Sequence, residues 1–505
     1  MKLIIKIIPL DSPFALVNEK DFPKKITYPC QLRISRDGIN FPIQAYLTNK
    51  YVATGEIGIS SSVFEKYGLS EDTEVDVHTR KTFDSIAHRI IIEKVKGVKG
   101  RDLGKEDMDA ITKGFMNADI SPSHSSAFVL SQHFTEFSLD EIEAMARSFA
   151  DSGKMYDFSG PVFDKHSIGG VPGNKITLLI VPILAAAGLL IPKTSTHAIT
   201  SASGTADTMS VLAPVELNAS DVLEMVKKTK GCIVSGTDMG IAPVVDRIIT
   251  EAAFPLGIDP ESLFLAGILA KKLAMGVDFM ALDIPVGNGT KVESEEEGRA
   301  LARSFVNLAA RLGIKAEAGL TYANVPVGHS IGPLLEAAEA MDALSGKGPT
   351  SLVEKSCEIA GIVFELAGMT GRGLGKPYAA DILQSGKALT KMQEIIEAQG
   401  GNPKITSSDL RQQLEGLPRL SYLAPSDGWP HTWNNYALKE IARAAGAPGD
   451  PLAGIQILSK KESVRKNEEV FRVYASSESD LDEVRGLIAK LRPVIVESVL
   501  LERIS

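Results

Sequence analysis

The spacing of apolar residues changes several times along the chain, and each change predicts a different kind of element. Up to about residue 85, the apolar residues form short runs rich in β-branched side chains, a pattern typical of strands. We expect strands within the segments KLIIKIIP, CQLRIS, FPIQAYL, YVATGEIGIS and TEVDVHT. Residues 1–85 are therefore predicted to form a β module.

Between Lys105 and Lys154, the apolar residues recur at helical spacing. Ser138 and Glu141 have the spacing of a capping box, in which each side chain accepts a hydrogen bond from the other residue's backbone N–H group. A helix is predicted to begin there. Its apolar face is expected to contain Ile142, Met145, Ala146 and Phe149.

Farther along, strand-like apolar runs alternate with helices, which is typical of an α/β domain. GCIVSG and DFMALDIPV predict strands, and RALARSFVNLAARLG predicts a helix. The run ITLLIVPILAAAGLLIP has the length of a membrane span, but it contains a proline and lies between polar loops, so we expect a buried helix. Near the C-terminus, FRVYASS and RPVIVESVLLERI are predicted strands that flank the helix DLDEVRGLIAKL.

Composition narrows the class of protein. A chain of 505 residues, 44% hydrophobic and 23% charged, is typical of a soluble globular protein with about two to four domains. The net charge of -9 argues against a nucleic-acid partner. The N-terminus lacks the features of a signal peptide, and the three cysteines have no metal-site or disulfide spacing. We therefore expect a cytoplasmic protein without a metal, another cofactor, or a membrane partner.

Polar loops in the middle of the chain carry the candidate chemistry: KHSIGGVPGNK, KTSTHAITSASGTADT, FPLGIDP and VGNGTK. Each borders an apolar run, so we expect each at a strand end, where open α/β sheets bind ligands. Hydroxyl groups, lysines and backbone N–H groups suit phosphate oxygens. The P-loop pattern is absent, because Lys175 is followed by Ile176. Taken singly, these loops could be surface turns, with a solvated lysine or a structural histidine at His166. Together they favour a phosphate-handling site.

Two of these loops resemble motifs of a known family. KHSIGGVPGNK resembles the K-H-S-x-G-G-V-G-D loop of the thymidine and pyrimidine nucleoside phosphorylases. The second loop resembles their S-G-R-x-x-x-x-T-G-G-T-x-D signature at Ser195, Gly204, Thr205 and Asp207. ILAKKLAMGVD, VGHSIGPLLEAAEAMDALSGKGP and SGKALTKMQEIIEAQGGNP are similar to later segments of the same family. The resemblance covers about residues 86–505. With the β module included, the chain is similar to one branch, the archaeal-type AMP phosphorylases.

The resemblance implies an α/β fold with three main parts: an N-terminal β module, a small helical domain and a larger α/β domain, with the active site in the cleft between the last two. On this basis we expect a β module at 1–85, a discontinuous helical domain at 86–162 and 240–275, the α/β domain at 163–239 and 276–401, and a C-terminal α+β segment at 402–505. It also implies a homodimer or a higher homo-oligomer.

The resemblance further implies roles for individual residues. The co-substrate, inorganic phosphate, would be held by Lys165, Ser167, Thr177, Ser195 and Thr205, with Thr177 at a position where the family has serine. The nucleotide would be bound by Gly170, Thr196, His197, Ala198, Ile199, Thr200, Ser201, Thr205 and Lys291. His166 corresponds to a family histidine near the sugar and base. Asp259 corresponds to an aspartate that protonates the departing purine.

Three further positions depart from the family pattern. The nucleoside phosphorylases hold the pyrimidine with an arginine, a serine and a lysine; the lysine is kept here as Lys271, but Ala252 and Gly267 occupy the other two positions. A buried carbonyl without a donor is costly, so a thymidine-type base is disfavoured. Gly267 also departs from the AMP phosphorylase branch, which has serine. His197 stands where the family signature has arginine.

We therefore expect phosphorolysis of a nucleoside 5′-monophosphate, AMP and also CMP or UMP, to a free base and ribose 1,5-bisphosphate. Asp259 would give a proton to the purine N7, which requires its pKa to be raised in a closed site. The segment from Thr196 to Ser201, with Lys291, would hold the 5′-phosphate. The alternatives are a uridine or thymidine phosphorylase, a phosphoribosyltransferase of the anthranilate type, and a nucleotide-binding scaffold or adaptor.

Overall fold

The computed structural model describes residues 1–9, 12–22, 30–36, 39–79, 86–97, 102–117, 119–198, 201–459 and 463–498. The chain divides into two compact units, and it crosses between them several times. Unit 1 contains Met1–Ser152 and Ala242–Ala270, and unit 2 contains Gly153–Ile241 and Lys271–Ser505.

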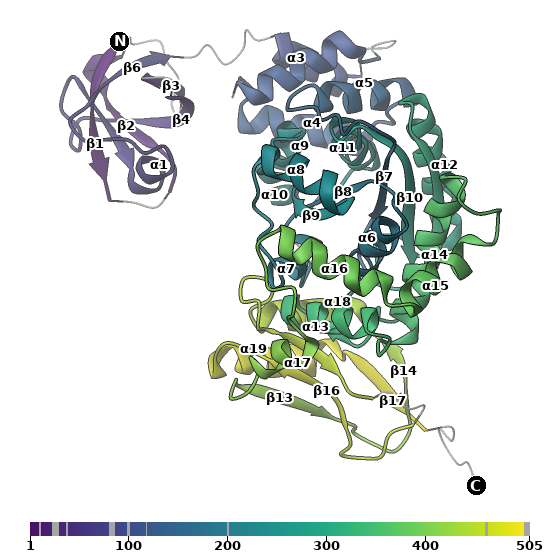
Figure 1. Cartoon of the computed structure of the whole chain (residues 1–505). Coiled ribbons are helices and arrows are strands. Elements are labelled where there is room, and N and C mark those ends of the chain that lie inside the picture. The colour runs from purple at the N-terminus through teal and green to yellow at the C-terminus, as the bar shows by residue number, and fades with distance from the viewer. Residues whose placement is uncertain are drawn as a thin grey trace. The chain divides into compact units, whose positions relative to one another are not determined.

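Unit 1 begins with a closed β-barrel, seen in purple in Figure 1. Its strands are β1 (Lys2–Ile8), β2 (Ala15–Asn18), β3 (Cys30–Arg36), β4 (Ile39–Thr48), β5 (Glu56–Ser60) and β6 (Glu74–Thr79), with the short helices η1 (Glu19–Asp21) and α1 (Ser61–Lys66). They pair in the order β1-β5-β2-β4-β3-β6 and then back to β1. Apolar side chains at alternate positions fill the barrel, as the period-two pattern predicts. Closure leaves no strand edge unpaired.

The predicted strands of this module are confirmed with one correction. The segment YVATGEIGIS is a strand only from Glu56 onward, because residues 51–55 form bends and a turn that ends at Gly55. Gly55 has a φ of 88°, a conformation that glycine adopts without strain and that would end a strand. Strand β2 was not predicted, since its run of four residues is too short to show alternation.

The rest of unit 1 is helical. Its helices are α2 (Ile86–Val95), α3 (Lys105–Met116), α4 (Pro122–Phe134), α5 (Leu139–Ala150), α9 (Pro243–Ile248), η2 (Ile249–Ala253), α10 (Phe254–Leu256) and α11 (Glu261–Ala274), the last of which continues into unit 2. α9, from the second chain segment, packs against α3 and α5 from the first. The predicted capping box is confirmed: Ser138 Oγ accepts from the backbone N of Glu141 at 3.3 Å, and Glu141 Oε2 accepts from the backbone N of Ser138 at 3.0 Å.

Unit 2 is built on parallel strands. β7 (Val162–Ser167), β10 (Val277–Val286) and β11 (Lys315–Tyr322) form one sheet, and β8 (Ile191–Ser195) pairs with β9 (Gly231–Ser235). A parallel bridge between Val162 and Leu190 links the two groups. Every pairing is parallel, so the carboxyl ends of these strands lie along a common edge.

The helices around this sheet are α6 (Thr177–Ala186), α7 (Thr205–Ser210), α8 (Ala219–Thr229), α12 (Glu295–Arg311), α13 (Pro333–Leu344), α14 (Thr350–Leu366), α15 (Gly375–Gln384) and α16 (Lys387–Ala398). A further helix, α17 (Ser407–Gln412), packs against α13. The run ITLLIVPILAAAGLLIP forms α6 and the start of β8, and α6 is buried against α14 and α16, as predicted. Within the described residues, no helix has both the length and the apolar character required to span a bilayer.

The C-terminal part of unit 2 is α+β. Its elements are β12 (Ser330–Ile331), β13 (Arg419–Leu423), β14 (Trp429–Trp433), α18 (Asn435–Ala444), β15 (Gly454–Ile457), β16 (Glu469–Tyr474), α19 (Glu478–Leu491) and β17 (Val494–Glu497). The antiparallel sheet β12-β15-β16-β13 and the pair β14-β17 enclose a separate core with α18 and α19. The predicted strands and helix here are confirmed within the described residues. The finer division of the chain at residues 85, 162, 240, 275 and 402 stays a prediction.

Candidate active site

Three of the polar loops predicted to carry chemistry do begin at strand ends. KHSIGGVPGNK begins with the last three residues of β7, KTSTHAITSASGTADT with the last three of β8, and VGNGTK with the last residue of β10. The expectation was wrong for FPLGIDP, which contains α10 and ends directly before α11. The run before it is helical rather than extended and forms α9 and η2.

Gly170 brings two of these loops together. Its φ is 94°, and a Cβ added there would lie 2.6 Å from the backbone N of Lys291. The loop after β7 therefore packs directly on the backbone of the loop after β10, and a side chain at this position would prevent that contact. Gly170 and Lys291, which were predicted to bind the nucleotide, are thus neighbours in unit 2.

Ser167 lies in a hydrogen-bond network centred on Asp283. Ser167 Oγ donates to Asp283 Oδ2 at 2.7 Å and accepts from Asn174 Nδ2 at 2.8 Å. Thr321 Oγ1 donates to the other Asp283 oxygen at 2.6 Å, and Lys355 Nζ lies 3.0 Å from Oδ2. Burial raises the pKa of Asp283, but the neighbouring Lys355 and the hydroxyl donors outweigh it, so the pKa lies below its usual value. The Ser167 hydroxyl is therefore oriented by a buried carboxylate.

Lys165 lies on the same face of β7 as Ser167, because side chains alternate along a strand. It is buried, and its ammonium makes no ion pair or hydrogen bond with another described residue. Burial lowers the pKa of Lys165 to about 8, although Asp283 opposes this effect. A buried ammonium without a direct counter-ion is costly, and an anion bound beside it would remove that cost.

The opposite face of β7 carries a second buried ion cluster. Asp164 Oδ2 lies 2.5 Å from Lys272 Nζ of α11, and Oδ1 lies 3.1 Å from Lys193 Nζ of β8. Burial lowers the pKa of Lys193 to about 7, against the attraction of Asp164. His166 shares this face. Burial, together with the charges of Lys272 and Lys193, holds its pKa well below the usual histidine value, so its imidazole is neutral near pH 7.

Counted together, the two clusters contain four buried lysines and two buried aspartates: Lys165, Lys193, Lys272 and Lys355 against Asp164 and Asp283. The formal surplus of two positive charges is the arrangement expected where an anion binds. Sequence reasoning identified only Lys165 among these six residues. Asp283 and Lys193 could have been found from the sequence, because each places a charge inside an apolar strand, DFMALDIPV and IPKTS. Such a charge must be paired with an opposite charge or bind a ligand.

The predicted phosphate threonines are close to each other. Thr177 is the first residue of α6 and Thr205 the first of α7, and Thr205 Oγ1 donates to Thr177 Oγ1 at 3.4 Å. Ser195 ends β8, and its Oγ donates to the carbonyl oxygen of Thr196 at 3.4 Å. These weak hydrogen bonds leave the hydroxyl groups able to turn toward another acceptor.

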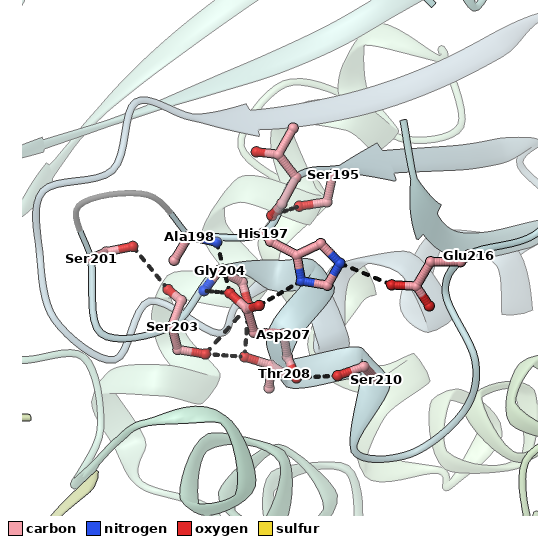
Figure 2. A network of polar contacts seen from close by, with 11 residues as sticks. Ser195, His197, Ala198, Ser201, Ser203, Gly204, Asp207, Thr208, Ser210 and Glu216 are labelled. Carbon is pink, nitrogen blue, oxygen red and sulfur yellow. Dashed lines mark hydrogen bonds and ion pairs between the residues drawn. The ribbon is translucent and has the colours of Figure 1, made fainter. Parts of the chain in front are cut away.

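The loop after β8 closes on Asp207, as Figure 2 shows. Asp207 Oδ2 accepts from the backbone N of Ala198 at 2.8 Å and of Gly204 at 2.7 Å. His197 Nδ1 lies 2.6 Å from Asp207 Oδ1, and its Nε2 lies 3.0 Å from Glu216 Oε1. Ser201 Oγ donates to the carbonyl oxygen of Ser203 at 3.2 Å. Ile199 and Thr200, also predicted to bind the nucleotide, lie outside the described residues.

Asp259 lies in unit 1, in the exposed segment before Pro260 and α11. Its assignment as the proton donor stays a prediction. Ala252, which the resemblance aligned with an arginine of the nucleoside phosphorylases, is buried in the same unit. A Cβ at Gly267 would lie 3.0 Å from Val245 Cγ1, so a serine there would require a small shift of the valine.

Comparison with known proteins agrees with this architecture. Residues 89–153 match a family model described as the helical bundle domain of a glycosyl transferase family, and residues 159–389 match the a/b domain of the same family. These matches confirm the predicted helical part and α/β part, and the N-terminal β-barrel confirms the predicted β module. The predicted position of the active site, in a cleft between the last two, stays a prediction.

A solved structure has the same fold. The crystal structure of anthranilate phosphoribosyltransferase from Thermus thermophilus superposes with a TM-score of 0.51 at 19% identity, covering 62% of this chain and 99% of the other. At this identity the likeness concerns the fold alone.

Curated relatives match much more closely. The AMP phosphorylase of Thermococcus kodakarensis is 40% identical over 510 residues, covering all of both chains. That of Methanospirillum hungatei is 44% identical, covering 92% of this chain and 90% of the relative, and that of Methanocorpusculum labreanum is 41% identical, covering 100% and 99%. The resemblance seen in the loop motifs is therefore confirmed along the whole sequence, and the chain belongs to the AMP phosphorylase family.

Proposed function

We propose that this protein is an AMP phosphorylase: a pentosyltransferase that cleaves AMP with inorganic phosphate to adenine and ribose 1,5-bisphosphate. The observation that carries the proposal is the surplus of buried lysines around β7, in a chain whose full-length relatives are AMP phosphorylases. We extend the proposal to CMP and UMP, and to a role in nucleotide salvage or degradation.

In this proposal, phosphate binds at the carboxyl end of β7. Lys165 supplies the unpaired charge, and Ser167, Thr177, Ser195 and Thr205 supply hydroxyl groups. Because Asp283 already accepts the Ser167 hydrogen, Ser167 must rotate its hydroxyl or accept from a protonated phosphate oxygen. The anion would raise the pKa values of Lys165 and Lys193, so phosphate binding should be accompanied by proton uptake.

The reaction then exchanges one bond at the sugar. The C1′–N9 bond of AMP breaks while an oxygen of phosphate forms a bond to C1′, and the electron pair of the broken bond leaves with the base. Asp259 transfers its proton to N7, which makes the base a better leaving group. Neutral His166 has no charge that would repel the oxocarbenium-like sugar. Positioning and electrostatics supply the remaining rate acceleration.

The nucleotide's 5′-phosphate is assigned to the loop from Thr196 to Ser201 and to Lys291, beside Gly170. We further propose that the enzyme needs no metal or other cofactor, acts in the cytoplasm, and assembles as a homodimer or a larger homo-oligomer. The three cysteines, Cys30, Cys232 and Cys357, have no disulfide spacing in the sequence, which fits a reducing compartment.

The test is to follow phosphate consumption and base release with AMP, with uridine and without substrate. We expect adenine release only when AMP and phosphate are both present, with one phosphate consumed per adenine. Turnover of uridine but not AMP would replace the proposal with a pyrimidine nucleoside phosphorylase, which the alanine at position 252 disfavours. Binding of AMP without turnover under any condition would favour a scaffold.

A further inference from the structure

His197 contacts a carboxylate at each of its two ring nitrogens. Nδ1 lies 2.6 Å from Asp207, in the first turn of α7, and Nε2 lies 3.0 Å from Glu216, which follows that helix (Figure 2). A neutral imidazole donates from one nitrogen only, whereas the imidazolium donates from both. With both carboxylates ionised, both contacts are hydrogen bonds only when the ring is protonated.

The bridge acts on the loop through Asp207. One oxygen of Asp207 accepts the backbone N–H groups of Ala198 and Gly204, at either end of the loop, and the other faces His197. Gly204 lets the loop come close, since a Cβ there would lie 2.8 Å from the carbonyl oxygen of Thr196. The imidazolium thus fixes the orientation of the carboxylate that ties the loop together.

Loss of the proton would break one side of the bridge. A neutral ring can donate to only one of the two carboxylates; with its hydrogen on Nδ1, toward the nearer Asp207, the lone pair of Nε2 faces the Glu216 carboxylate. The lone pair and the carboxylate repel each other. Because the Glu216 side chain is exposed, it can move away from the ring. His197 would then lose its contact with the segment after α7.

We propose that His197 is a positioning residue that makes nucleotide binding pH dependent: its imidazolium, held between Asp207 and Glu216, keeps Asp207 on the backbone N–H groups of Ala198 and Gly204, and its deprotonation weakens binding of AMP. This inference rests on the proposed function. Arginine is a cation that does not titrate near neutral pH, so a His197→Arg variant would keep the charge and lose the pH dependence.

The electrostatics agree with the direction of the effect. Burial lowers the pKa of His197, but the hydrogen bonds and charges of Asp207 and then Glu216 outweigh it, so its pKa is raised above 6.5. These two carboxylates are the charged groups that act on the ring from the packed elements. For a raised pKa, the favourable contribution is complete below the ordinary value and is lost as the pH rises through the folded value.

The experiment compares the wild type with His197→Arg between about pH 6 and pH 9. AMP and phosphate also titrate in this range, but they do so identically with both proteins. The ratio of the wild-type KM for AMP to the variant's KM for AMP therefore reports the titration of His197. We expect the wild-type KM to rise about two- to fivefold relative to the variant, because half-exposed ion pairs contribute modestly. The ratio of their kcat values should stay constant.

Glu216→Gln provides the second variant, since an exposed glutamine keeps the shape and removes the charge. Its KM profile, and the NMR titration of His197 assigned by its absence in His197→Arg, should both move to lower pH. A constant KM ratio, or an unmoved His197 titration, would overturn this inference while leaving the proposed function intact. A wild-type protein that cleaves no AMP at any pH would overturn the proposed function, and this inference with it.

Discussion

Lys165 is where the phosphate site can be tested most directly, because its buried ammonium forms no direct ion pair with another described residue. Lys165→Ala should raise the KM for phosphate about tenfold or more, since a hydrogen bond to a charged group contributes about 1.5–3 kcal/mol. The KM for AMP should change far less. Steady-state kinetics with each substrate varied in turn would measure both, with the exposed Lys228→Ala as the control. Equal losses for the two substrates would contradict the assignment.

The lowered pKa of the same lysine predicts a pH profile. Phosphate is attracted by the protonated form, and burial places the pKa of Lys165 at about 8 in the free protein. The KM for phosphate should therefore be lowest below this pH and rise as the pH increases through it. Lys165→Ala should lack the rise. A rise of the same size in the variant would assign it to another group, such as Lys193.

Asp259 is the residue predicted to supply chemistry rather than binding. Asp259→Asn keeps the size of the side chain but removes the transferable proton, so kcat for AMP should fall about 10²–10⁴-fold while AMP still binds. Single-turnover rates and equilibrium binding would separate the two effects. UMP has no N7, so its phosphorolysis should depend on Asp259 to a different degree.

The alternative for Asp259 is a local structural role, since it is exposed and directly precedes Pro260 at the start of α11. In that case Asp259→Asn would lower the melting temperature and leave the rate unchanged. A folded variant with a normal kcat for AMP would exclude the proton-donor role.

At the scale of single residues, the sequence predicted the site residues that lie in local motifs. It did not predict those that distant segments bring to the site. Lys165, Ser167 and Asp207 stand in recognisable loops. Lys272 and Lys355 come from helices far along the chain, and each looks like an ordinary helix lysine in the sequence. Their burial beside Asp164 and Asp283 depends on packing, which no local pattern reports.

At the scale of elements, the cap of α5 offers a stability test. The Glu141 carboxylate accepts from the backbone of Ser138 and of Leu103, lies 2.5 Å from Lys94 Nζ, and is buried. Ser138→Ala removes the cap and should cost about 1 kcal/mol of unfolding free energy. Glu141→Ala also leaves Lys94 unpaired, and should cost about 3–5 kcal/mol. Denaturant unfolding of both variants would measure the difference. Equal losses would mean that Glu141 contributes only as a cap.

Elements were predictable where one period dominates the pattern. The α5 and α12 helices have clear apolar faces, and β9 and β10 are continuous apolar runs, so all four were identified. The segment from α9 to α10 was less readable, because it changes to a π-helical turn at η2 and is only three residues long at α10. Short or irregular elements are stabilised by their neighbours rather than by their own sequence.

At the scale of the whole molecule, the β-barrel should be separable from catalysis. Its buried residues, from Leu3 to Val77, form a core of their own, and the candidate site residues all lie beyond residue 162. Deleting residues 1–84 should leave measurable phosphorolysis of AMP while changing the assembly size or the melting temperature. Size-exclusion chromatography and activity would test this. A folded truncation that binds phosphate but is inactive would show that the barrel contributes to the site.

The alternation of side chains along β7 has a consequence for the evolution of this sequence. Lys165 and Ser167 face the Asp283 network, while Asp164 and His166 face the Lys193 and Lys272 cluster. Each charge therefore meets its partner only while the side chains keep this alternation. Inserting or deleting one residue between positions 162 and 167 would exchange the two faces and place every charge beside the wrong partner. A second substitution can compensate for a single substitution, whereas substitutions made one at a time cannot compensate for a changed alternation. The length of this strand should therefore persist longer than the identity of most residues in it.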